Sequence, residues 1–128
     1  MRHLDPRSVA SVLKRGRSVE NFIGQVPSVH VPSVRYIELR PADGRVELWV
    51  HDLDDCGDAD FTDLVEFPLL DPDSADEPSA TFSDADVAIA HAEAQFGAAR
   101  DRWTNVTMCH DDYADFVRAG RPASWPVA

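Results

Sequence analysis

Six aspartates lie in the twelve-residue stretch Asp52–Asp63, near the middle of the chain, and their side-chain oxygens could bind a cation. Carboxylates occupy positions one, three, nine and twelve of this stretch, and Gly57 occupies position six. Hard divalent cations prefer such oxygen ligands, and a glycine permits a sharp turn between them. The candidate metal ligands are Asp52, Asp54, Asp58, Asp60 and Asp63.

The spacing resembles the calcium-binding loop of EF-hand proteins over these twelve residues alone. The resemblance implies a calcium site, but the sequence departs from the pattern in several places. Position five is Cys56, a poor ligand for a hard cation, and position eight is Ala59 where the family has a β-branched apolar residue. Position twelve is Asp63 rather than the longer glutamate, and a predicted strand precedes the stretch where the motif requires a helix. An exposed acidic hairpin loop is therefore the favoured interpretation, and no cofactor is expected.

Softer ligands and a nucleophile are also present. The set His51, Cys56, Cys109 and His110 could bind zinc, although adjacent ligands such as Cys109 and His110 rarely bind one ion. Cys109 could also act as a nucleophile beside a distant His51 or His91. The chain has no G-x-S-x-G elbow, no phosphate-binding glycine loop and no H-E-x-x-H motif. Two buried thiols are the favoured interpretation, because cysteine is among the most buried residue types.

The charge of the chain is segregated along the sequence. The net charge is -11, yet residues 1–45 hold eight basic and four acidic residues, whereas residues 46–99 hold fifteen acidic residues and no Lys or Arg. A surface of this kind repels phosphates and anionic membranes and attracts basic proteins. Lys14 is the only lysine among twelve basic residues, and such usage is also typical of a high-GC bacterial genome. That alternative explains the acidity, but it explains less well the long stretch without a basic residue.

These observations favour a non-enzymatic protein that binds and neutralises a basic protein, most concretely an immunity- or antitoxin-like inhibitor of a toxin such as a nuclease. Carboxylates steer the encounter with a basic partner, and a few aromatic anchors supply affinity. Trp49 and Trp103 are expected in the core, and Trp125 near the C-terminal end is the better contact candidate. A metal- or ligand-sensing domain that uses residues 52–63 is the first alternative, and an unrecognised small enzyme is the second. The predicted partner-binding residues are Asp52, Asp54, Asp55, Asp58, Asp60, Asp63 and Trp125.

A chain of 128 residues predicts one α+β domain over residues 1–128, with flexible tails at 1–4 and 121–128. Two cysteines, no apolar leader and no bilayer-length apolar run indicate a cytoplasmic protein with reduced thiols. Binding to nucleic acid or membranes is not expected, and the sequence leaves a monomer and a homodimer open.

The expected antiparallel sheet has three to five strands. Alternating apolar residues predict a hairpin in which strands near 34–40 and 46–51 flank the turn residues 41–44. A third strand is expected over 61–70 and a fourth over 102–109, while the proline-containing segment 25–32 indicates an edge strand or a connection. Residues 71–80 are expected to form an exposed loop.

The main helix is predicted over 84–96, capped by Ser83 and ended by Gly97. Val87, Ala90 and Ala94 are expected to face the sheet. A short helix is expected from Asp5 to Gly16, with a further turn over 18–22, and a final helix is expected to be capped by Asp111 or Asp112 and ended by Gly120.

Overall fold

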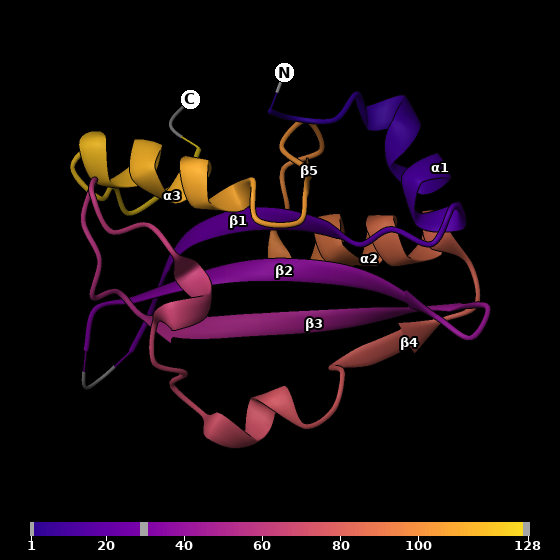
Figure 1. Cartoon of the computed structure of the whole chain (residues 1–128), viewed down its shortest axis with the longest axis horizontal. Helices are drawn as coiled ribbons and strands as arrows, with labels where there is room; N and C mark the ends of the chain where they lie inside the picture. Colours follow the sequence, from indigo (N-terminus) through magenta and orange to yellow (C-terminus); the bar gives the residue numbers. More distant parts are fainter. Residues whose placement is uncertain (1, 29–30, 127–128) are drawn as a thin grey trace.

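Five antiparallel strands form one sheet in the computed structural model, which describes residues 2–28 and 31–126 (Figure 1). The spatial order is β4-β3-β2-β1-β5. The predicted α+β class and the number of strands are confirmed. The strands are β1 Val19–Val26, β2 Ser33–Ala42, β3 Arg45–Asp54, β4 Ala80–Phe82 and β5 Thr104–Asn105.

The predicted hairpin is present as β2 and β3, and these strands lie in the middle of the sheet. The register of the hairpin runs without interruption from Ser33 opposite Asp54 to Ala42 opposite Arg45. The two turn residues, Asp43 and Gly44, have positive φ angles of 52° and 76°. Such a turn matches the twist of the strands that it joins, and glycine adopts the required backbone at no steric cost.

The predicted helical turn over 18–22 is wrong, because β1 begins at Val19 and pairs with β2. The side chains of β1 alternate between two buried layers, so Val19 joins one apolar cluster and Phe22 the other. Burial on both faces removes the contrast between apolar and polar positions that usually identifies a strand. The register shifts between Phe22 and Gly24, where Trp125 packs directly against the glycine.

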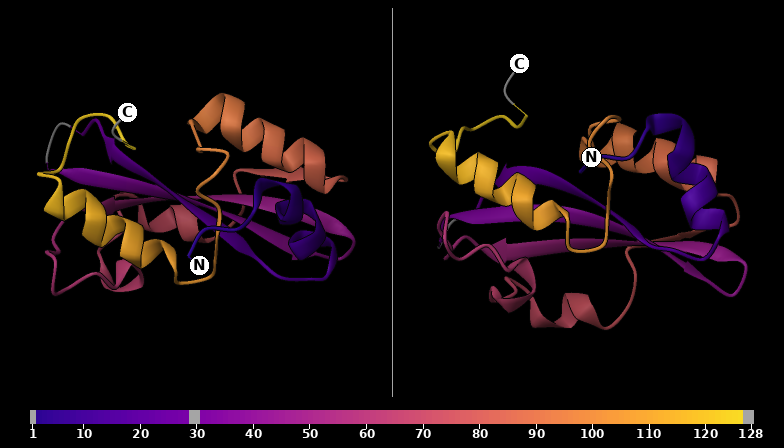
Figure 2. Two further views of the ribbon diagram at one scale, coloured as in Figure 1. Left: turned by 90° about the horizontal axis from the view of Figure 1, so that it is seen from above. Right: turned by 45° about the horizontal axis from the view of Figure 1, so that its top comes forward.

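Helices cover both faces of the sheet. The helix α2 (Ala85–Phe96) lies on one side of the sheet and α3 (Cys109–Arg118) lies on the other (Figure 2). The short helix α1 (Val9–Lys14) packs in the same apolar cluster as α2, together with Leu39, Leu48 and Trp103. The second cluster lies under α3 and includes Phe22, Tyr36 and Tyr113. No helix in the described part of the chain has the length and apolarity needed to cross a bilayer.

The helix α2 occupies its predicted range, but its cap and its buried face differ from the prediction. The Asp84 carboxylate, rather than Ser83, accepts hydrogen bonds from the backbone N–H groups of Asp86 and Val87 at 2.7 and 3.4 Å. Gly97 ends the helix with a φ of 73°, as expected. The buried residues are Ala85, Ala88 and Ala92, while Val87 is 54% exposed. Alanines lie against the sheet because they let the helix backbone approach closely.

The helix α3 begins at Cys109, so both predicted cap residues, Asp111 and Asp112, lie inside it. Asp112 is therefore inside the helix and fully buried, where it pairs with Arg2 at 2.7 Å and with His3 at 2.9 Å. These contacts fix the N-terminal segment to α3. Flexibility of the tails stays a prediction, and Met1, Val127 and Ala128 lie outside the described residues.

The predicted strand over 61–70 is wrong. This segment contains a short 3₁₀ turn, Leu64–Glu66, and its only β-pairing with the sheet is a bridge between Leu53 and Leu69. Leu64 and Phe67 are both buried although they are three residues apart, a spacing that an alternating strand cannot place on one face. The predicted strand over 102–109 reduces to the two residues of β5. Within the predicted loop 71–80, a second 3₁₀ turn covers Pro72–Ala75.

Candidate partner-binding surface

Two of the six predicted aspartates hold the fold together. Asp52 forms a two-pronged ion pair with Arg35 across the hairpin, at 2.6 and 2.9 Å. The Asp55 carboxylate accepts a hydrogen bond from the Tyr113 hydroxyl at 2.5 Å and pairs with Arg121 at 2.9 Å. Only 4% of the Asp55 side chain is exposed. Both carboxylates are neutralised by cations from elsewhere in the chain, so they contribute little to the surface field.

The other four aspartates, Asp54, Asp58, Asp60 and Asp63, are available at the surface. Asp58 and Asp60 are exposed, and the Asp58 carboxylate accepts backbone N–H bonds from Asp60 and Phe61 at 2.8 and 2.9 Å. The Nδ1 atom of His110 lies 3.7 Å from an Asp63 carboxylate oxygen, and half of the Asp63 side chain is exposed. No arginine or lysine lies between residues 46 and 99 to neutralise these groups.

The loop does not have the arrangement of a calcium site. Within residues 2–28 and 31–126, no group of three or more His, Cys, Asp or Glu side chains is placed to hold a metal ion. Asp52 turns to Arg35, and Asp58 closes a local backbone turn. Since an EF-hand loop directs its oxygens to a common centre, the resemblance in sequence does not extend to the folded loop.

Apolar side chains are exposed among these carboxylates, a feature that the sequence reasoning missed. Phe61, Val65 and Leu70 are 41%, 66% and 38% exposed, and they are three of the five large apolar side chains that reach solvent in the described chain. An alternating strand over 61–70 would place Val65 and Phe67 on the same face of the sheet. In the structure Phe67 is buried and Val65 is exposed. The spacing of Leu64 and Phe67 was the available signal, since two anchors three residues apart indicate a turn that presents the residues between them.

The loop that carries these side chains is held firmly. Its backbone returns to β3 through bonds from Asp54 N–H to the Pro68 carbonyl at 2.9 Å and from Leu70 N–H to the Asp52 carbonyl at 3.0 Å. Gly57 leaves no room for a side chain, because an added Cβ atom would overlap the Phe61 carbonyl oxygen and the Phe67 ring. The loop therefore presents its charges and apolar groups from a fixed backbone. We call residues 54–70 the acidic–apolar surface.

Trp125, the predicted aromatic contact, is half-buried. Its ring packs edge-on against Phe116 with a centroid separation of 5.8 Å, and the Arg102 guanidinium lies 5.2 Å from its centroid. Its side chain also meets Gly24 of β1. Trp125 therefore belongs to the α3 side of the core as well as to the surface, and its role in partner binding stays a prediction.

The two cysteines lie in different environments, one buried and one exposed. Cys109 is fully buried, and its thiol donates a hydrogen bond to Glu20 at 3.1 Å. Burial and the neighbouring Glu20 carboxylate raise the pKa of this thiol well above its usual range, and burial likewise raises the pKa of Glu20. A nucleophilic cysteine needs a lowered pKa, so Cys109 is arranged in the opposite sense. Cys56 is exposed, and slight desolvation of its thiol together with the nearby Asp54 carboxylate raises its pKa as well.

A polar cluster occupies the face of β2 and β3 beyond α3. The Glu38 carboxylate accepts hydrogen bonds from His51 at 3.1 Å and from Arg40 at 2.9 Å. Burial alone would raise the pKa of Glu38, but these two donors outweigh burial and lower it to about 2. The Arg40 guanidinium also lies 4.3 Å from the centroid of Trp49. Glu38 thus has both His51 and Arg40 as partners, and the cluster stabilises the sheet.

Comparison with known proteins finds no match for this chain among protein-family models, curated proteins or solved structures.

Proposed function

We propose that this protein binds and neutralises a basic protein partner through the acidic–apolar surface, in the manner of an immunity or antitoxin protein that blocks a toxin. The partner contacts are Asp54, Asp58, Asp60 and Asp63 together with Phe61, Val65 and Leu70. Asp52 and Asp55 support this surface from below through their ion pairs with Arg35 and Arg121.

One observation carries the proposal: exposed apolar side chains are concentrated among unneutralised carboxylates. Most protein interfaces combine an apolar centre that supplies affinity with charged surroundings that accelerate association and select the partner. Phe61 and Val65 supply the apolar centre; Asp54, Asp58 and Asp60 precede Phe61 in the sequence, and Asp63 lies between Phe61 and Val65. A basic partner meets opposite charge here and is not repelled by any lysine or arginine of the same segment.

The fixed backbone of the loop favours tight binding. A flexible loop loses conformational freedom when it binds, and that loss reduces affinity. Here the buried anchors Leu64 and Phe67 and the Asp55 contacts hold the loop before the partner arrives. The free energy of contact is then not spent on ordering the chain.

We further propose that the protein acts in the cytoplasm. Cys56 and Cys109 are both free thiols, and Cys56 is exposed, which suits a reducing compartment.

Affinity capture followed by a binding measurement tests this function. The immobilised chain is used to capture partners from cells of its source at low and high salt, and the product of the neighbouring gene is tested first. The captured protein is then purified, and its Kd is measured by calorimetry across a salt series. We expect a basic partner whose affinity falls as salt rises.

Two charge-matched variants locate the contact. In the surface variant, Asp54, Asp58, Asp60 and Asp63 are changed to Asn, and in the control Asp43, Asp86, Asp101 and Asp111 are changed to Asn. All four control residues are exposed and have no side-chain partner in the described chain. The surface variant should bind at least tenfold more weakly with a reduced salt dependence, whereas the control should bind nearly as the natural chain does. Equal effects of the two variants would show that overall charge, rather than this surface, attracts the partner.

A further inference from the structure

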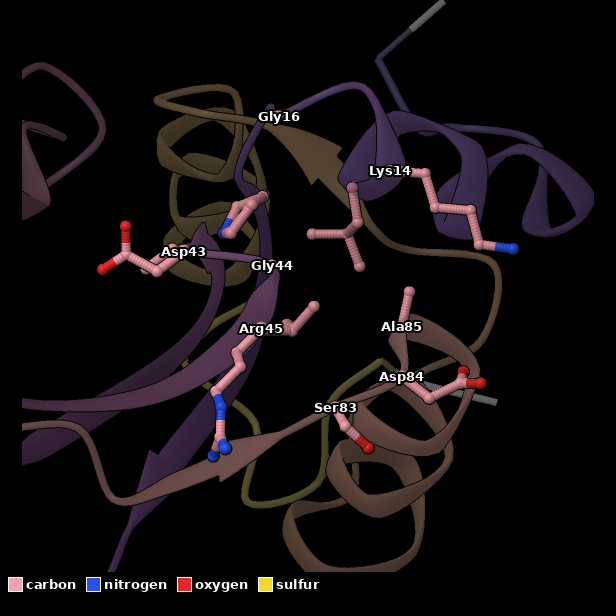
Figure 3. A pocket seen from close by; sticks show the side chains of 12 residues that line it. Lys14, Gly16, Asp43, Gly44, Arg45, Ser83, Asp84 and Ala85 are labelled. Atoms are coloured by element: carbon pink, nitrogen blue, oxygen red, sulfur yellow. The ribbon is translucent and has the colours of Figure 1, made fainter.

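A cavity of about 510 Å³ lies beside the turn of the hairpin (Figure 3). The acidic–apolar surface begins at the other end of this hairpin, at Asp54. It is enclosed by the end of α1, the turn between β2 and β3, and the start of α2. Leu13, Val46 and Ala85 line it, and all three are more than nine-tenths buried. This volume falls in the range of pockets that bind small molecules, and the apolar lining is typical of them.

Two cations without carboxylate partners border this cavity. Lys14 lies on the α1 side of the cavity and Arg45 on the β3 side, and both side chains run outward from it (Figure 3). Neither forms an ion pair with any described residue, although the chain holds 23 acidic and only 12 basic residues. Unpaired cations are unexpected where carboxylates are so abundant.

The unpaired cations of the protein gather at this end. Seven arginines form ion pairs in the described chain, namely Arg2, Arg7, Arg35, Arg40, Arg102, Arg118 and Arg121. Of the five remaining basic residues, Arg15 and Arg17 flank the lining residue Gly16, and only Arg100 lies elsewhere in the sequence. Four of the five basic residues that form no ion pair in the described chain therefore line this cavity or flank a residue that lines it.

Two carboxylates also lie at the cavity, and neither closes it to an anion. The Asp43 carboxylate points away from the cavity (Figure 3). The Asp84 carboxylate caps α2 by accepting the N–H groups of Asp86 and Val87. The positive end of the helix dipole partly offsets its charge. Lys14 and Arg45 keep their charges without such compensation.

We propose that this cavity binds a small organic anion. The compact apolar body of the ligand lies against Leu13, Val46 and Ala85, and its carboxylate, sulfonate or phosphate group is held by Lys14 and Arg45. Long, flexible cationic side chains on two sides of a cavity can close over such a group, and arginine can hold it with two parallel hydrogen bonds. The inference is independent of partner binding by the acidic–apolar surface, since the two sites share no residue.

Fluorescence titration with anilinonaphthalene sulfonate tests this site, because the probe joins an aromatic body to one negative charge. N-phenylnaphthylamine, which has a similar aromatic body without the charge, is the matched neutral probe. We expect the anionic probe to bind with one-to-one stoichiometry and at least tenfold more tightly than the neutral probe. Backbone NMR shifts caused by the anionic probe should centre on residues 13–16, 41–46 and 83–85.

Variants separate the two parts of the site. Lys14→Gln with Arg45→Gln should weaken the anionic probe at least tenfold, whereas Arg100→Gln with Arg118→Gln removes the same charge elsewhere and should leave its affinity unchanged. Ala85→Leu fills the cavity and should weaken both probes. If Ala85→Leu does not fold, the first pair of variants decides the question. Equal affinity for the two probes, equal effects of the two double variants, or NMR shifts centred on Phe61, Val65 and Leu70 would overturn the proposal.

Discussion

Leu64 and Val65 are neighbours in one short turn, and their substitutions should have very different effects on stability. Leu64 is 0% exposed and packs under the loop with Phe67, whereas Val65 is 66% exposed. Removing a buried leucine side chain leaves a cavity, so Leu64→Ala should cost about 2–5 kcal/mol of unfolding free energy. Val65→Ala removes atoms that water already contacts, so it should change stability by less than about 0.5 kcal/mol.

Thermal unfolding followed by circular dichroism measures this difference. For a domain of this size, each kcal/mol corresponds to a shift in Tm of about 4 °C. Leu64→Ala should therefore lower the Tm by roughly 8 °C or more, and Val65→Ala by no more than about 2 °C. Urea titrations of both variants provide the free energies at one temperature. A large loss of stability in Val65→Ala would refute the reasoning, because it would mean that Val65 is packed against the fold and is not free to contact a partner.

Three further predictions follow from individual contacts. Gly57→Ala should destabilise the protein by about 1–3 kcal/mol in urea titrations, since its Cβ would overlap Phe61 and Phe67; an unchanged midpoint would show that the loop yields easily. Glu38 has a pKa of about 4.5 when unfolded and about 2 when folded, so its stabilisation is complete above pH 4.5 and is lost as the pH falls toward 2. Glu38→Gln should therefore flatten this part of the profile of stability against pH, and a slope as steep as that of the natural chain would contradict the assignment. Iodoacetamide should modify the exposed Cys56 under native conditions and the buried Cys109 only after unfolding, as peptide mass spectrometry can determine; rapid native labelling of Cys109 would show that its thiol is not enclosed by the core.

The central hairpin could be predicted from the sequence because its two strands and its turn signals agree. Alternating residues on both sides of Pro41–Gly44 indicate the register, and the turn needs the positive φ angles that Asp43 and Gly44 adopt. The strand β1 could not be recognised in this way. Its side chains are buried on both faces, and Gly24 interrupts the pattern at the place where Trp125 packs.

The helix α2 shows why a buried face is harder to predict than a helix. Its ends follow local rules, because Asp84 caps the start and Gly97, with a left-handed backbone, ends the helix. The sequence indicates Gly97 correctly and places the cap one residue too early, at Ser83. Its orientation depends on how closely the sheet approaches, which favours the alanines over the larger Val87. Hydrophobicity alone would place Val87 against the sheet, whereas in the structure its side chain is exposed.

The candidate site could be predicted in part. The acidic character of residues 54–63 follows from the sequence, but the division between supporting and available aspartates does not. Asp55 finds its partners Tyr113 and Arg121 more than fifty residues away, and no local pattern announces such a contact. The exposed apolar residues Phe61, Val65 and Leu70 could not be predicted for a similar reason. A 3₁₀ turn and a strand of alternating residues differ little in sequence over so short a segment.

Hydrogen exchange of the chain, free and bound to its basic partner, tests the central claim most directly. Binding should slow exchange of the backbone amides within residues 54–70. The amides of α2 and of the residues that line the cavity beside Lys14 and Arg45 should exchange as they do in the free protein. Protection centred on α2, or the absence of protection within residues 54–70 in a saturated complex, would contradict the claim that this surface binds the partner.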